Sequence, residues 1–251
     1  MARAKRADGA SLMLQSAAMR RALPLFLLIA VLAAVAAAPE VEITSEPSHH
    51  LAIENEYLRV FQVEVAPRAS TLMHRHRHDY VFVTLGDSHV SNEVEGKAPV
   101  ELKLADGDTR FVPGNFAHIA RNLAETPFRN VTIEILQDKQ HKKVRKTLRS
   151  WEIKVDTTFP GGHSKVLLEK AQVSVSEVDL DAGGTMPSHH HTGPHLLVAV
   201  SDLDLRSDIE GAGPVPGKFK AGDVKWLPGG YTHTLTNTGA HAARFVTVEI
   251  P

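Results

Sequence analysis

Short runs in which apolar and polar residues alternate dominate the chain beyond about residue 45. Examples are VSVSEVDL at 173–180 and RFVTVEI at 244–250, and Gly, Pro, Asp and Asn residues separate such runs. Alternation with a period of two indicates strands with one buried face, and the turn residues between them favour antiparallel connections. The pattern predicts an all-β fold made of small antiparallel barrels or sandwiches.

The same part of the chain is an internal repeat. An offset of 115 residues aligns two copies without a gap, so that NVTIEI at 130–135 falls on FVTVEI at 245–250. A register that holds through motif-rich and motif-poor stretches indicates duplication of one domain. The expected domains are residues 45–136 and 161–251, and they are joined by a linker at 137–160.

The linker contains the basic stretch QDKQHKKVRKTLRSWEIK at 137–154. A short helix or a site for an acidic surface are alternatives there, but runs of charge usually lie on solvated faces, which favours an exposed linker. Limited proteolysis should then cut between about residues 137 and 165 and release two stable fragments.

The first 38 residues have the pattern of a secretory signal peptide. Arg20 and Arg21 precede a stretch without charge from Ala22 to Ala38, which ends in closely spaced alanines. This order of a cationic and an apolar region is typical of signal peptides. An uncleaved membrane anchor is the alternative, since the stretch is only just long enough to span a bilayer. The prediction is a periplasmic or secreted protein with no stable membrane insertion after cleavage.

Composition directs attention to histidine. The 251 residues include 28 Lys and Arg against 29 Asp and Glu, no Cys and 15 His. The balanced charge gives no general attraction to nucleic acid, and the lack of cysteine excludes disulfides, thiolate metal sites and cysteine nucleophiles. A local site for a small molecule is expected, and the sequence leaves a homo-oligomer open.

The histidines of the second repeat are spaced to meet at one point. His189 and His191 are two residues apart, so on a strand both face the same side of the sheet, whereas His190 faces the other side. His195 follows a Thr-Gly-Pro turn, and His233 arrives from a later strand. Four imidazoles at one point would suit a divalent transition metal.

These residues resemble the motifs of the cupin superfamily, G-x5-H-x-H-x3,4-E-x6-G and G-x5-P-x-G-x2-H-x3-N. The residues that match in the second repeat are Gly183, His189, His191, Gly222, Pro228, Gly230, His233 and Asn237. The resemblance implies two tandem double-stranded β-helix (jelly-roll) barrels, a bicupin. His195 stands where the family has glutamate.

The first repeat matches less completely. Its predicted ligands are His74, His76 and His118, and the glutamate position holds Tyr80. His76 with His78 is an alternative chelating pair, because both have the same strand parity. Histidines outside the motifs, at 49, 50, 89, 141, 163 and 241, are expected at the surface.

The predicted ligand sets limit the metal and its chemistry. Without the family's glutamate, imidazole ligands favour Zn, Fe, Ni or Cu over Mn. A site of three histidines beside a phenol keeps positions open, which makes the first repeat the expected seat of any chemistry. Three-histidine cupins include dioxygenases, so the resemblance implies dioxygen or hydrolytic chemistry on a small substrate, as in a metal-dependent, dioxygenase-like enzyme. The alternatives are a non-catalytic periplasmic metal or small-ligand binder and a structural domain that the metal only stabilises. No catalytic residue is predicted.

Overall fold

The computed structural model of the protein describes residues 39–136, 156–170 and 173–250. The predicted signal peptide and residues 137–155 of the predicted linker lie outside this part. Export, cleavage and the domain boundaries therefore stay predictions.

The described residues form strands and a single short 3-10 helix. In the first repeat these are β1 (Val41–Glu42), η1 (Ile43–Ser45), β2 (His49–Glu54), β3 (Leu58–Val65), β4 (His74–His76), β5 (Tyr80–Leu85), β6 (Ser88–Val94), β7 (Val100–Leu104), β8 (Thr109–Val112), β9 (Phe116–Asn122) and β10 (Phe128–Ile135). In the second they are β11 (Thr157–Phe159), β12 (Gly162–Lys170), β13 (Val173–Leu180), β14 (Thr185–His191), β15 (His195–Ala199), β16 (Leu203–Ile209), β17 (Gly213–Phe219), β18 (Val224–Leu227), β19 (Tyr231–Asn237) and β20 (Ala243–Glu249). A search of these residues finds no helix long and apolar enough to cross a membrane.

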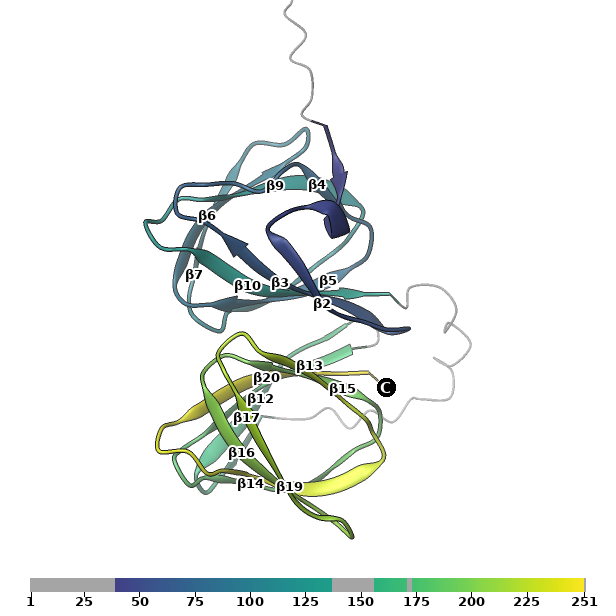
Figure 1. Ribbon diagram of the computed structural model, residues 1–251, viewed down its shortest axis with the longest axis vertical. Coiled ribbons are helices and arrows are strands. Elements are labelled where there is room, and N and C mark those ends of the chain that lie inside the picture. Colours follow the sequence, from purple (N-terminus) through teal and green to yellow (C-terminus); the bar gives the residue numbers. More distant parts are fainter. Residues whose placement is uncertain (1–38, 137–155, 171–172, 251) are drawn as a thin grey trace, which may run out of the picture. The chain divides into compact units, whose positions relative to one another are not determined.

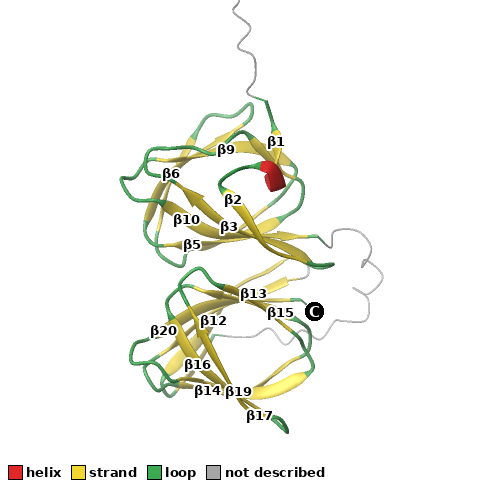
Figure 2. Ribbon diagram, in the orientation of Figure 1, coloured by secondary structure: helices red, strands yellow, loops and turns green. Residues whose placement is uncertain are grey.

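Each repeat consists of two sheets (Figures 1 and 2). The strand orders are β1-β4-β9-β6-β7 and β2-β3-β10-β5-β8 in the first repeat, and β14-β19-β16-β17 and β11-β12-β13-β20-β15-β18 in the second. Strands that are distant in sequence lie side by side, as β3, β10 and β5 do, which is the connectivity of a jelly roll. The all-β prediction is confirmed.

The two repeats share strand register as well as strand order. His74 lies opposite His118 on β4 and β9, and His189 lies opposite His233 on β14 and β19. The offset of 115 residues found in the sequence is therefore an equivalence of positions in the fold.

The sheet that carries β3, β10 and β5 is buried on both faces. Val81 and Val83 of β5 are fully buried on one face, while Tyr80 and Phe82 point to the other, into the barrel where the histidines lie. Strands buried on both faces need cover outside the barrel, because bare apolar faces of this size are rare on monomers.

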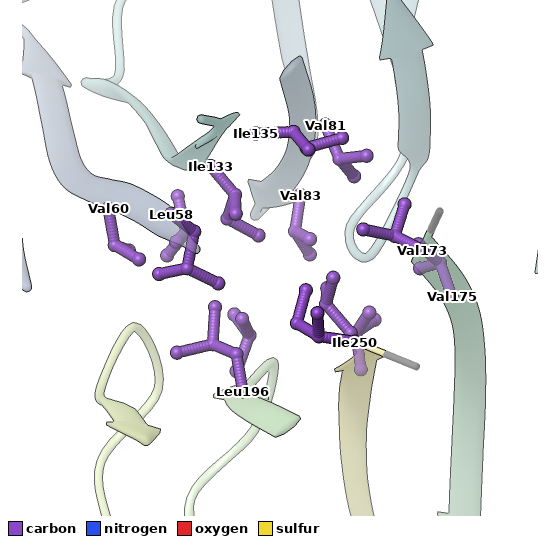
Figure 3. Packing of buried hydrophobic residues seen from close by; sticks show 14 of the residues in the cluster. Leu58, Val60, Val81, Val83, Ile133, Ile135, Val173, Val175, Leu196 and Ile250 are labelled. Atoms are coloured by element: carbon purple, nitrogen blue, oxygen red, sulfur yellow. The ribbon is translucent and has the colours of Figure 1, made fainter. Parts of the chain in front are cut away.

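The outward residues of both repeats belong to one buried cluster within the compact unit of residues 38–251 (Figure 3). Its members are Leu58, Val60, Val81, Val83, Leu85, Val131, Ile133 and Ile135 with Val173, Val175, Leu196, Val198, Val200, Val246, Val248 and Ile250. Each residue of the first set has its repeat equivalent in the second. The duplication therefore preserved this outer apolar face as well as the site.

A tight turn before β9 and β19 fixes the histidine strands. The backbone N–H of Asn115 donates to His76 O at 2.6 Å, and that of Gly230 donates to His191 O at 2.7 Å. Both residues have positive φ, 67° and 81°. Glycine adopts this conformation freely, and asparagine is among the few other residues that tolerate it. Asn115 thus occupies the position of the motif glycine that the first repeat lacks.

Candidate metal centres

Three histidines of the second repeat meet inside the barrel. The Nε2 atom of His233 lies 2.9 Å from Nε2 of His189 and 3.1 Å from Nε2 of His191. Their ligand atoms all lie within 4.8 Å of one another. Three ring nitrogens directed at one point are the arrangement that a transition metal requires.

Neighbouring groups hold the opposite ring nitrogens of His189 and His233. Nδ1 of His189 donates to Pro187 O at 2.8 Å, and Nδ1 of His233 lies 2.6 Å from the Ser207 hydroxyl. A hydrogen bond at Nδ1 fixes the ring and leaves the lone pair on Nε2, as metal-binding histidines usually have it.

His190 and His195 lie outside the group. His190 is exposed and its ring contacts the Thr232 hydroxyl, in agreement with its strand parity. His195 is buried and stacks on His191, with ring centroids 3.9 Å apart and planes at 11°. Lone pairs of parallel rings lie in separate planes, so they do not converge on one atom. The structure thus assembles three of the four expected imidazoles around a point, and His195 lines the wall beside them.

The histidine group of the first repeat includes one residue that lies outside the motifs. Ligand atoms of His49, His74 and His76 lie within 4.8 Å of one another. His49, expected at the surface, is only 9% exposed, and its ring centroid is 4.7 Å from that of His74. The surface interpretation of His49 is therefore wrong, because β2 carries it into the barrel interior.

Glu46 orients His49. One carboxylate oxygen lies 2.6 Å from Nδ1 of His49, and the other accepts the backbone N–H of Leu72 at 3.1 Å. Burial opposes the charge of this carboxylate, but the hydrogen bonds outweigh it and lower the pKa of Glu46. A fixed negative charge at Nδ1 leaves Nε2 of His49 as the ligand atom.

His118 adjoins this group, with ring centroids 4.5 Å from His74 and 5.2 Å from His76. Its Nδ1 lies 2.6 Å from Asn92 Oδ1. The Nε2 atoms of His74 and His118 are buried and have no hydrogen-bond partner within the described residues. Buried polar atoms without a partner are costly, and a bound metal ion would satisfy both. His78 lies between β4 and β5, outside the group.

Tyr80 stacks on His76 as His195 stacks on His191. The ring centroids are 4.1 Å apart and the planes differ by 20°. Burial, with a smaller effect of Glu134, raises the pKa of the Tyr80 phenol. The group is therefore a neutral hydroxyl at neutral pH, which makes it a poor metal ligand.

A glutamate accompanies the second histidine of each pair, and it is buried in the first repeat and half-buried in the second. Glu134 Oε1 lies 3.5 Å from Nδ1 of His76, and Glu249 Oε1 lies 3.5 Å from Nδ1 of His191. The two glutamates are repeat equivalents, opposite Tyr80 and His195 on the neighbouring strands. The motifs did not identify them, although both lie in the matched segments NVTIEI and FVTVEI.

Burial favours the neutral form of His74 and His233. It lowers the pKa of His74 to about 4, an effect that the neighbouring His49 reinforces. Burial and then the adjacent histidines lower the pKa of His233 to about 3. Neutral imidazoles keep their lone pairs at neutral pH, so both groups suit a divalent metal ion.

The two sites open into cavities of different size. The cavity of the first repeat has a volume of about 220 Å³, and that of the second about 1210 Å³. The larger one extends from His189, His191 and His233 to the exposed residues His190 and Lys225, so solvent can enter it. These volumes favour the second repeat as the seat of ligand binding, contrary to the expectation from the ligand sets.

No family model matches the sequence, and no curated protein matches it either. Solved structures do share its architecture. Oxalate decarboxylase from Bacillus subtilis has a TM-score of 0.57 at 13% identity, over 78% of this chain and 69% of that chain. Vicilin from Solanum melongena has a TM-score of 0.58 at 14% identity, over 77% and 74% of the two chains. The chain has a bicupin fold.

A third solved structure matches over more of the chain. It is a cupin 2 conserved barrel domain protein from Leptotrichia buccalis, with a TM-score of 0.51 at 13% identity over 81% of this chain and 88% of that chain. Structural similarity at such low sequence identity establishes the fold of this chain but not its chemistry, which has to be argued from its own residues.

Proposed function

We propose that this protein is an exported metal-binding bicupin that holds a divalent transition metal in its second repeat and uses it to bind a small molecule. The observation that carries the proposal is the convergence of three imidazole nitrogens in the wall of a large cavity open to solvent. The ligands are His189, His191 and His233. A bound ion would supply a Lewis acid for an anionic or carbonyl group of the small molecule.

The chain's own residues prepare this site. Pro187 O and the Ser207 hydroxyl fix the rings of His189 and His233 with Nε2 toward the cavity. His195 and Tyr231 contact each other at 3.5 Å in the cavity wall. Both can donate a hydrogen bond to a ligand atom near the histidines, and so orient it.

The first repeat is proposed to hold a second ion. Its ligands are His49, His74 and His76, with His118 adjoining them. The small cavity and the additional histidine support a role in stability there, because a fuller ligand set leaves fewer positions for a substrate.

The Mn(II) centres named for the oxalate decarboxylase raise manganese as a candidate. The histidine groups of this chain include no carboxylate among the described residues, so their donors are neutral imidazoles. Imidazole donors favour zinc, iron, nickel or copper, and these are the proposed metals.

A second candidate function is metal-dependent oxygen chemistry on the bound molecule. It is favoured by the three-nitrogen set in the second repeat, which leaves positions for both a substrate and a co-reactant. Turnover of a ligand under air, and its loss without oxygen, would distinguish this enzyme from a binding protein.

Metal analysis of protein exported and purified without a histidine tag tests the proposal. The native protein should carry up to two metal equivalents, and His191→Ala or His233→Ala should remove one and lower the melting temperature. His190→Ala is the matched control, because its ring points away from the group, and should keep the full complement. Equal metal content in the His190→Ala and His191→Ala variants, both reduced, would contradict the ligand assignment.

A further inference from the structure

The wall of the larger cavity is apolar directly behind the histidines. Leu235 lies two residues beyond His233 on β19, and Met186 pairs with it on β14. Val178, Leu197, Leu205 and Phe245 line the same cavity, and each is at most 6% exposed. The histidines thus form one part of the cavity wall, and these apolar side chains form the adjoining part, which we call the apolar chamber.

The first repeat offers an internal comparison. At the positions of Phe245 and Met186 it has Asn130 and Thr71, and at the position of Leu235 it has the smaller Ala120. Asn130 accepts the Thr132 hydroxyl at 2.8 Å, so this end of the smaller cavity is polar. At two matched positions of the same fold, the second repeat therefore has apolar wall residues where the first has polar ones.

The size of the side chains that line the two cavities also differs at matched positions. Leu197 of the second repeat corresponds to Phe82 of the first, and Ser164 corresponds to His49. Both second-repeat residues line the large cavity. Smaller side chains at these positions leave room beside the histidines for the body of a ligand.

We propose that the second cavity takes a small molecule with one polar, metal-binding end and an extended aliphatic or aromatic body, rather than a compact dicarboxylate. This inference rests on the proposed function for the polar end. The body would displace water from Val178, Leu197 and Phe245, and a volume of about 1210 Å³ accommodates it. Burial of each methylene group should strengthen binding by about fourfold.

A titration of the zinc-loaded full-length protein with monocarboxylates tests the inference. Acetate, butyrate, hexanoate and octanoate keep the polar end constant while the body grows, and oxalate serves as the compact dicarboxylate. Calorimetry should give a dissociation constant that falls about fourfold per methylene, with octanoate binding more tightly than oxalate. A flat series, or tighter binding of oxalate, would overturn the inference.

The variant Leu197→Phe introduces the residue that the first repeat has at the same position. It should weaken octanoate binding at least tenfold and leave acetate binding and metal content unchanged. Leu51→Phe, at an exposed leucine of β2, is the matched control and should bind octanoate as the native protein does. If Leu197→Phe fails to fold, the series on the native protein still decides.

The two proposals fail in different ways. The same titration after removal of metal by a chelator separates them. A dependence on chain length that persists without metal supports the apolar chamber and refutes the role of the metal in holding the carboxylate. Metal-dependent binding without any dependence on chain length supports the metal and refutes the apolar ligand.

Discussion

At the residue scale, we expect Glu134 and Glu249 to act through the histidines beside them. Each lies 3.5 Å from Nδ1 of the second histidine of its pair. Burial raises the pKa of Glu134, while His78 and Arg59 work in the opposite direction. A carboxylate behind an imidazole holds the ring and makes its other nitrogen a stronger ligand.

Replacement of these glutamates should weaken metal binding without removing a ligand. Glu249→Gln should lower the metal affinity of the second site about 10- to 100-fold, and Glu134→Gln should do the same at the first. Competition with a chromophoric chelator measures both. Glu64→Gln, at an exposed position of β3, is the control; an affinity in Glu249→Gln equal to that of this control would contradict the assignment.

His49 yields a prediction specific to the first repeat, since the equivalent position in the second is Ser164. His49→Ala should weaken metal binding at the first site only, because the pair with Glu46 directs its Nε2 toward His74 and His76. His50→Ala, at the exposed neighbour, should leave both sites intact. Loss of metal from the second site instead would disprove the division of ligands.

The sequence predicted residues whose role follows from strand parity. His189 and His191 face the same side of their strand and His190 faces the other, because side chains alternate between the two sides of a strand. It did not predict His49, because the strand that carries it lies outside the motifs and its burial depends on the closure of the barrel. Stacking of His195 on His191 likewise depends on how far apart neighbouring strands lie. The positions of residues along the sequence do not give that distance.

At the scale of elements, the turn before β9 and β19 connects backbone conformation to the site. Gly229 packs so closely that an added Cβ would lie 2.3 Å from the backbone of Gly193, whereas a Cβ at Gly230 has free space but positive φ. The sequence located this turn from its Pro and Gly residues. It did not show that Asn115, rather than Gly114, carries the left-handed conformation in the first repeat.

Substitutions in this turn should lower the free energy of unfolding by different amounts. Gly230→Ala should destabilise the fold by about 1–2 kcal/mol through its φ angle, and Gly229→Ala by more, because backbone atoms must move apart. Asn115→Gly should be close to neutral, since glycine adopts the same conformation. Chemical denaturation measures all three, and a larger loss for Gly230→Ala than for Gly229→Ala would contradict this description of the turn.

At the scale of the whole molecule, the outer apolar face of each repeat matters most. The alternating pattern predicted one buried face per strand, yet Val81, Val83 and Ile133 on the outer face are fully buried as well. Sequence periodicity could identify the strands but not the cover on their second face, because that cover comes from residues far away in the chain. Both repeats contribute equivalent positions to the same cluster.

This cluster changes the outcome expected from proteolysis of the predicted linker. Cleavage between about residues 137 and 165 should still occur, but the two fragments should remain associated. Their separation would expose eight apolar positions on each repeat to water. Gel filtration after cleavage should show a single species with the size of the intact protein, and mild denaturant should separate the fragments. The substitution Val83→Asp, on the outer face away from the histidines, should let them separate without denaturant, whereas Glu64→Gln should not. Fragments of the native protein that separate freely in buffer would show that the outer faces are stable without each other.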